Sequence, residues 1–303
     1  MAVKPIEERR LLGIGLVLGG YLCFSIIDSC AKWLMLQGLP PLEVVFVRYL
    51  GQFLLVLALF LPRDGKALVV TKRPWIEFWR AIGLLGSTIF NFLAIIYLPL
   101  TVTASIGFTM PFVVVALSIP LLGEKVGWRR WAAIVVGFIG VLIIVRPGSA
   151  DFHPAIFLSF GAVICSAFYM LFTRALAGVD GSTTQQFYAA GISTLCLLPI
   201  AFGSWVWPND ISTWIPFILI GVAALVGHQL ITVAHRFAPA SVLAPFNYVL
   251  IVYLTASSWL VFNQPPDIWI FVGAPIVVAS GLYIWLRERQ LAKTTVTEVA
   301  PED

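Results

Sequence analysis

Ten apolar stretches separated by short polar segments constrain this chain more than any other feature of its sequence. A helix that crosses the hydrocarbon core of a bilayer needs about 20 mostly apolar residues, and each stretch approaches that length. Hydrophobic residues make up 60% of the chain and charged residues only 11%, which excludes an ordinary soluble domain. The sequence therefore predicts an all-α integral membrane protein whose ten transmembrane helices cover 11–36, 42–61, 76–97, 101–122, 129–145, 154–177, 184–205, 213–234, 239–262 and 267–286.

The two halves of the chain resemble each other weakly. When the sequence is shifted by 140 residues, Pro99 aligns with Pro239 and the aromatic Phe108 aligns with the aromatic Tyr248. A unit with an odd number of helices must be inserted upside down when it is repeated, which is a common arrangement in secondary transporters. We therefore expect two inverted five-helix repeats followed by a flexible cytoplasmic tail, with boundaries at 1–148, 149–290 and 291–303.

The basic residues predict how the chain is inserted, because cytoplasmic loops are enriched in Lys and Arg. With the amino terminus in the cytoplasm, only Arg146 falls clearly outside, while Lys32 and Arg48 fall within helices. This bias predicts a multi-pass protein of the bacterial inner membrane with both termini cytoplasmic and with the loops near Gly38 and Ser149 outside. The remaining basic residues are assigned to the cytoplasmic side, among them Arg63, Lys72, Arg80, Arg129 and Arg174.

Several short motifs occur in order along nearly the whole chain. They are Arg48-Tyr49-Leu50, Ala104-Ser105 with Pro111, Leu121-Leu122-Gly123-Glu124, Gly137 to Gly140, and Ala238 to Pro245. In this order they resemble the drug/metabolite transporter superfamily, specifically its ten-helix, two-repeat (EamA-type) branch, and within it most of all the YddG-type exporters of aromatic amino acids. Members of this family often have Glu where this chain has Gln264, which leaves open whether a second loop carboxylate has a role.

Three charged residues, Asp28, Lys32 and Arg48, lie within predicted helices. They are candidates for a charge pair or for a role in gating. Asp28 and Lys32 are four residues apart on one helix face, where opposite charges can pair, and Arg48 lies at a similar depth on the next helix. One interpretation is a local pair near the outer interface, with Lys32 extending its amine toward water. The other is a role in substrate binding or gating, because charges inside a membrane are costly unless they are paired or hydrated. We expect Asp28 and Arg48 to interact.

Other polar and aromatic residues are candidates for a binding site near the middle of the membrane. Asn91 and His228 are explained equally well by hydrogen bonds between helices, and His228 could also relay protons. His228 and His235 have no further ligands that would complete a metal site. The site hypothesis assigns an apolar wall to Phe24, Phe108, Tyr169 and Tyr248, and hydrogen bonds to Asn91, His228 and Asn247.

The sequence predicts a carrier and no enzyme. It contains no phosphate-binding loop or cofactor fingerprint, so we expect no cofactor, no nucleic-acid partner and no ATP-driven step. The leading hypothesis is export of small amphipathic metabolites, above all aromatic or other hydrophobic amino acids, by alternating access between the two halves. The alternatives are an exchanger of sugar phosphates or nucleotide sugars, a drug exporter, and a membrane enzyme acting on a lipid-linked substrate.

Overall fold

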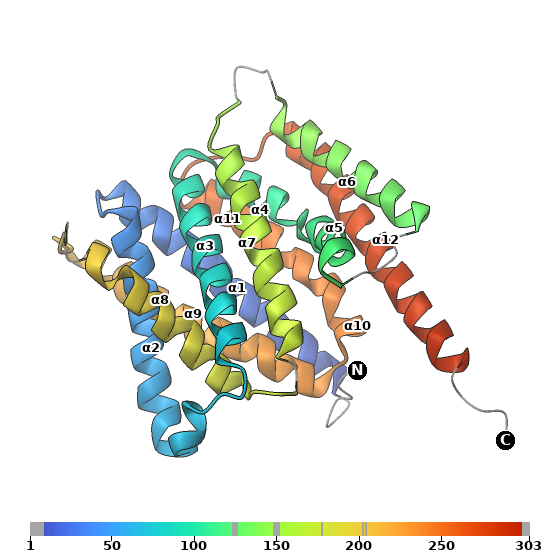
Figure 1. Cartoon of the computed structure of the whole chain (residues 1–303). Helices are drawn as coiled ribbons and strands as arrows, with labels where there is room; N and C mark the ends of the chain where they lie inside the picture. Colours follow the sequence, from blue (N-terminus) through green and yellow to red (C-terminus); the bar gives the residue numbers. More distant parts are fainter. Residues whose placement is uncertain are drawn as a thin grey trace.

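The computed structural model describes residues 9–122, 127–147, 152–176, 178–201, 203 and 205–298. Within these ranges every regular element is a helix, and the helices pack into one bundle (Figure 1). In the same parts of the chain, 7 helical segments are long and apolar enough to cross a membrane, and Trp131–Val145 is a shorter apolar helix. The predicted all-α membrane fold is confirmed.

Five spans make up the first half of the chain. Pro41 and Pro74 each stand at the start of a helix, where the missing N–H costs nothing. Gly38, which follows the first helix, has a φ of 94°, a conformation that glycine adopts without strain. The elements are α1 (Arg10–Leu36), α2 (Pro41–Asp64) with the short η1 (Gly65–Leu68), α3 (Pro74–Tyr97), α4 (Leu100–Gly107) with α5 (Met110–Leu122), and α6 (Trp128–Val145).

The second half also contains five spans. The carboxylate of Asp210 accepts a hydrogen bond from the backbone N–H of Thr213 at 2.9 Å and so caps α9. The elements are α7 (Ile156–Ala175), α8 (Ser182–Ala201), α9 (Ile211–Phe237), α10 (Ala240–Leu243) with η2 (Ala244–Tyr248) and α11 (Val249–Leu260), and α12 (Ile268–Glu298). The last helix continues past the expected start of the tail at residue 291, while residues 299–303, like Ser149, lie outside the described residues.

The fourth and ninth spans are broken, whereas the sequence predicted them as continuous over 101–122 and 239–262. The fourth breaks between Gly107 and Met110. Proline has no N–H, and its ring clashes with the carbonyl four residues earlier, so Pro111 disfavours a regular turn around Gly107. In the ninth span, Pro245 lies in the first turn of η2. The two breaks fall at positions that the repeat aligns with each other.

The helices pack into two units that do not coincide with the two halves of the sequence. The six-helix unit contains α1, α2, α3, α7, α8 and α9, in which α1 packs along α9, α3 along α7 and α2 along α8. The four-span unit contains the two broken spans together with α6 and α12, which lie side by side at the edge of the bundle away from α2 and α8 (Figure 1). Every one of these helix pairs joins one half of the sequence to the other. The two repeats therefore interleave.

Glycines bring helices from different halves into close contact. A Cβ on Gly51 of α2 would lie 3.1 Å from the Cα of Gly221 of α9. In the four-span unit, a Cβ on Gly273 of α12 would lie 2.5 Å from the carbonyl oxygen of Gly140 on α6. Small residues at such crossings let backbones approach, which is how helices gain contact inside a membrane. Both units are therefore closely packed internally.

The bundle has two distinguishable ends. At the terminal end, which carries the described ends of the chain, the backbone N–H of Arg9 donates to the carbonyl of Phe237 at 3.1 Å, and the hydroxyl of Tyr188 donates to the carbonyl of Val69 at 2.7 Å. At the far end, the backbone N–H of Val206 donates to the carboxylate of Glu43 at 2.9 Å. Alternate loops thus gather at the same end, as ten antiparallel spans require.

Candidate functional site

Two connected cavities lie between the six-helix unit and the four-span unit. The wide cavity has a volume of about 500 Å³ and the narrow cavity about 260 Å³, so the wide one alone is within the usual range for ligand sites. Both cavities are lined by the same group of residues where they meet, namely Phe24, Asp28, Asn91, Thr103, Gly107, Met110 and Ser166. They form one continuous space.

The wide cavity reaches the terminal end of the bundle. Arg174, in the last turn of α7, and Asn247, beside the break in the ninth span, both line it and are both exposed. Its walls are mainly apolar and aromatic, with Tyr21 and Trp285 facing it in addition to the predicted Phe108 and Tyr248. The narrow cavity extends from it toward the far end, where Ser159 of the first turn of α7 lines it. The space is therefore accessible from one end.

The broken spans bring their paired aromatic residues together in this cavity. The ring centroids of Phe108 and Tyr248 lie 4.9 Å apart at an interplanar angle of 51°, within the range of favourable aromatic pairs. A Cβ on Gly281 of α12 would lie 2.2 Å from the hydroxyl oxygen of Tyr248. Glycine at 281 thus leaves room for the Tyr248 ring beside the cavity.

Asp28 and Arg48 share the narrow cavity and interact through the attraction of their charges, as expected, but without a direct salt bridge. The carboxylate of Asp28 accepts a hydrogen bond from the side-chain amide of Asn91 at 3.0 Å. The Arg48 guanidinium lies 4.3 Å from the ring centroid of Tyr49, and its Nη1 is buried without a hydrogen-bond partner among the described residues. No ion pair within 4.0 Å joins Asp28 to Arg48 in the part of the chain that the structure describes.

His228 and Phe24 lie together at the wall of the narrow cavity. Their ring centroids are 5.0 Å apart in an edge-to-face arrangement, and α9 positions His228 opposite Phe24 of α1. Both residues line the narrow cavity, and Phe24 lines the wide cavity as well. The predicted site residues Phe24, Asn91, Phe108, His228, Asn247 and Tyr248 are thus brought to one space, while their binding role stays a prediction.

Lys32 lies outside both cavity linings and does not pair with Asp28. Its ammonium donates hydrogen bonds to the carbonyl of Leu98 at 2.8 Å and to the side-chain oxygen of Gln264 at 2.9 Å. These partners belong to the α3–α4 and α11–α12 connections, so Lys32 joins α1 to the four-span unit at the far end. It is only 1% exposed. The structure therefore closes the far end around a fully buried cation.

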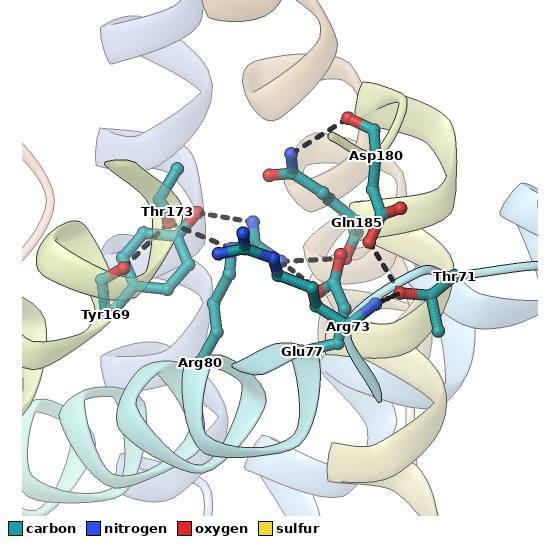
Figure 2. A network of polar contacts seen from close by, with 8 residues as sticks. All are labelled: Thr71, Arg73, Glu77, Arg80, Tyr169, Thr173, Asp180 and Gln185. Carbon is teal, nitrogen blue, oxygen red and sulfur yellow. Dashed lines mark hydrogen bonds and ion pairs between the residues drawn. The ribbon is translucent and has the colours of Figure 1, made fainter. Parts of the chain in front are cut away.

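Tyr169 is the predicted wall residue that the structure places elsewhere, because it lines neither cavity. Its hydroxyl accepts a hydrogen bond from Arg80 Nη2 at 3.1 Å, and the guanidinium lies 4.8 Å from its ring centroid. Arg80 also donates to Thr173 Oγ1 at 2.9 Å and to the carbonyl of Gln185 at 2.9 Å. Figure 2 shows Arg80 between these partners, with Glu77 on its own helix.

The charge assignment placed Arg80 on the cytoplasmic side together with the loop residues, and the structure shows that Arg80 is a buried helix residue. It lies within α3, is 4% exposed, and pairs with the fully buried Glu77 at 3.3 Å. The spacing of Glu77 and Arg80, three residues apart, is a sequence signal for such a pair. The sequence reasoning overlooked it because both residues lie close to a predicted helix end. Nearby, Asp180 accepts a hydrogen bond from the Thr71 hydroxyl at 2.5 Å, which ties the α2–α3 and α7–α8 connections together (Figure 2).

Sequence reasoning also missed hydroxyl and thioether groups that line the cavities. The hydroxyls of Ser87 and Ser166 are hydrogen bonded to each other at 2.5 Å and link α3 to α7 at the cavity wall. Met110 and Met170 add polarisable contacts. Such residues are common in any membrane helix, so their types gave no signal.

The sequence pattern of the EamA-like transporter family matches residues 11–146 and again residues 153–286. The chain belongs to the EamA-like transporter family. The double match confirms the two repeats, and membership places this EamA-like protein among transporters and not among enzymes.

Three relatives of this EamA-like transporter have names that state their substrates. The chain is 27% identical over 284 residues to an "S-adenosylmethionine uptake transporter" of Rickettsia conorii, covering 93% of this chain and 95% of that protein. It is 29% identical over 297 residues to a "Riboflavin transporter" of Vibrio cholerae, covering 95% and 99%. It is 25% identical over 260 residues to the "Pseudopaline exporter CntI" of Pseudomonas aeruginosa, covering 85% and 90%. The relatives are small-molecule transporters with diverse substrates.

Proposed function

We propose that this protein is a secondary transporter for small amphipathic metabolites that contain an aromatic ring, aromatic amino acids among them. The observation that carries the proposal is the contact between Phe108 and Tyr248 at the paired helix breaks, inside a cavity of about 500 Å³. Discontinuous helices at the interface between repeats are where many secondary transporters bind their substrates. Aromatic walls can stack on a planar ring, while the narrow cavity offers charged and polar groups.

Alternating access in this protein requires relative movement of the six-helix unit and the four-span unit. The halves of the sequence interleave within both units, so rocking of one sequence half against the other, as first expected, would break the closest helix contacts. The cavities lie between the units, and the far end is closed by Lys32 while exposed residues line the space at the terminal end. Movement of the four-span unit would open the far end and close the terminal end.

The names of the relatives favour a substrate with a planar ring and a polar chain. Riboflavin and S-adenosylmethionine both combine a heteroaromatic ring with a polar extension, and S-adenosylmethionine ends in an amino-acid group. Aromatic amino acids, the substrates of the YddG-type exporters that the sequence resembles, contain the ring and the amino-acid group in smaller form. A sugar phosphate exchanger is less favoured, because Lys32 is engaged at the far end and single arginines face the narrow and wide cavities among the described lining residues.

We retain export as the proposed direction and the bacterial inner membrane, with both termini cytoplasmic, as the proposed location. The relatives include an uptake transporter and an exporter, as expected of a fold whose net direction follows the solute gradients. The positive-inside bias supports cytoplasmic termini. In that orientation the accessible cavity of this structure faces the cytoplasm, the side from which an exporter collects its substrate.

The proposal is tested by counterflow of labelled solutes in proteoliposomes that contain the purified protein. We expect wild-type vesicles to accumulate labelled tryptophan, S-adenosylmethionine or riboflavin faster than empty vesicles when they are loaded with the same unlabelled solute. Transport no faster than in empty vesicles for all of these solutes would overturn the proposal.

Two glycines provide a matched pair of variants for the location of the site. A Cβ added at Gly107 or at Gly15 meets nothing within 4 Å, so a side chain can start at either position without a clash. Gly107 lines both cavities, whereas Gly15 lines neither. Gly107→Leu should therefore fill the cavity and abolish counterflow, and Gly15→Leu should leave it unchanged. Equal activity of the two variants at equal abundance would place the path elsewhere.

A further inference from the structure

Arg48 is a buried cation that forms no ion pair within 4.0 Å with any of the described residues. It lies in α2, is 5% exposed and faces the narrow cavity. Its Nη1 is buried and has no hydrogen-bond partner among the described residues, and its recorded contact is with the ring of Tyr49. A buried ionised group is strongly disfavoured unless it is paired and hydrogen bonded. An anionic group on the transported solute would supply what is missing.

The other buried cations of the bundle do not share this feature. The Lys32 ammonium has two oxygen acceptors, on Leu98 and Gln264. The Arg80 guanidinium is held by the carboxylate of Glu77 and by three further oxygen acceptors. Both of these residues lie outside the cavity linings. A missing partner and a position at the cavity occur together only at Arg48 among these three described residues.

Asp28 supplies the opposite charge at the same cavity. It lines both the narrow and the wide cavity, and Oδ1 accepts its hydrogen bond from Asn91 at 3.0 Å. Among the described residues, no ion pair within 4.0 Å uses its charge. A direct bridge to Arg48 would neutralise both residues, whereas the separated arrangement leaves one carboxylate and one guanidinium facing a shared space.

We propose that Arg48 and Asp28 form a two-pole site for an α-amino-acid group, in which Arg48 binds the carboxylate and Asp28 binds the ammonium. The inference rests on the proposed function and narrows its substrate class to zwitterionic amino acids and their conjugates. An α-amino acid carries both charges on one carbon, so it can contact two opposite charges that do not touch each other. Its side chain then points into the wide cavity, toward the aromatic pair formed by Phe108 and Tyr248.

The wide cavity can accept substrate side chains of different sizes. Because the two cavities meet at Asp28 and Asn91, a substrate anchored there can extend a ring system of variable length toward the terminal end. Apolar walls discriminate weakly between side chains. The amino-acid group should therefore determine recognition, and the ring should tune it.

The test uses the counterflow assay to compare compounds that lack one charged group with protein variants that lack the residue proposed to bind it. Phenylalanine contains both charges, phenethylamine lacks the carboxylate, and 3-phenylpropionate lacks the ammonium. Wild-type protein should transport phenylalanine best, and loss of one charged contact should reduce kcat/KM by about ten- to a hundredfold. In Arg48→Gln, phenylalanine should lose that advantage over phenethylamine, while in Asp28→Asn it should lose its advantage over 3-phenylpropionate.

The conservative variants and a control separate recognition from folding. Arg48→Lys should retain part of the preference for the carboxylate, because it keeps the charge but not the forked geometry. Glu43→Gln alters a buried carboxylate of α2 that lines neither cavity, and it should leave the substrate ranking unchanged. Variants that transport too slowly are compared by the shift in melting temperature that each compound causes in detergent. That binding readout should show the same ranking.

Each outcome has a distinct meaning. If every variant lowers transport of the three compounds by the same factor, Arg48 and Asp28 do not recognise the two charges and the two-pole site is wrong. If wild-type protein transports riboflavin, which has no amino-acid group, but none of the amino acids, the two-pole site fails while the proposed transport function stands. If no solute is transported at all, the proposed function itself fails.

Discussion

Arg80 and Arg48 are both buried arginines of the six-helix unit, yet their surroundings differ. Arg80 is held by a carboxylate, two hydroxyls and a backbone carbonyl, contributed by α3, α7 and the residues at the start of α8 (Figure 2). Arg48 faces a cavity, and Nη1 has no hydrogen-bond partner among the described residues. The first arrangement uses a charge to join helices, and the second leaves a charge available. Burial of an ionised residue in a membrane protein therefore does not by itself indicate a binding site. The distinguishing feature is whether other protein groups already occupy its hydrogen-bonding atoms.

The largest effect should follow from removing the charge that is fully paired. Arg80→Gln leaves the carboxylate of Glu77 buried without its cation, and breaking a buried pair in this way typically costs about 3–5 kcal/mol. We expect a clear loss of melting temperature in detergent and a lower yield from the membrane. Arg48→Gln, measured in parallel, should melt close to the wild type because it breaks no ion pair within 4.0 Å among the described residues.

These two melting temperatures test the roles assigned to Arg80 and Arg48 directly. A normal melting temperature for Arg80→Gln together with a large loss for Arg48→Gln would reverse the assigned roles. The double variant Glu77→Gln with Arg80→Gln sharpens the result, because it removes the stranded charge and should be more stable than Arg80→Gln.

A smaller effect is expected at Lys32, the third buried cation. Its acceptor Gln264 is neutral, and a carboxylate in its place would add a charge–charge attraction to the hydrogen bond that the ammonium already donates. Gln264→Glu should therefore stabilise the closed far end and slow counterflow by about tenfold, which corresponds to about 1.4 kcal/mol. Labelling of a cysteine placed at Gly107, which lines both cavities, should at the same time become faster from the terminal end.

The matched variant Gln264→Leu removes the acceptor and should have the opposite effect on labelling. Faster counterflow in Gln264→Glu, or labelling that does not depend on residue 264, would show that the Lys32 contacts do not hold the far end closed.

The fold was largely predictable because bilayer thickness imposes span length on the sequence. The apolar stretches gave the ends of the spans within a few residues except at the end of α12, and the alignment of Phe108 with Tyr248 anticipated a real contact. The interaction partner of Asp28 was not predictable, because the depth of Lys32, Arg48 and Asn91 in the membrane allows each of them to contact it. The packing of α1 along α9 and of α3 along α7 decides among these partners, and nothing in the local sequence of α1 encodes that choice.

The aromatic pair allows a test in which folding is preserved and recognition changes. Tyr248→Ala removes a ring that lines the wide cavity, and a contact between this ring and an aromatic substrate would contribute about 0.5–1.5 kcal/mol. We expect KM for aromatic substrates to rise by about two- to tenfold, while small amino acids such as alanine are transported as before. Asn247→Ala, beside it, should weaken the same aromatic substrates, because Asn247 lines only the wide cavity. Wild-type kinetics in both variants at equal abundance would remove the pair from the binding site.

The smallest effect is expected at Tyr169, which the sequence placed in the apolar wall and the structure places beside Arg80. Tyr169→Phe keeps the ring next to the guanidinium and removes only the hydroxyl that accepts the 3.1 Å hydrogen bond. A hydrogen bond of this kind contributes about 1 kcal/mol, so the melting temperature should fall by a few degrees at most. Because Tyr169 lines neither cavity, KM for every substrate should stay at the wild-type value. Tyr248→Phe is the matched control, since it removes the same hydroxyl from a residue that does line the wide cavity. A rise in KM for Tyr169→Phe, without a change in stability, would restore Tyr169 to the binding site and would mean that the cavity reshapes around it during transport.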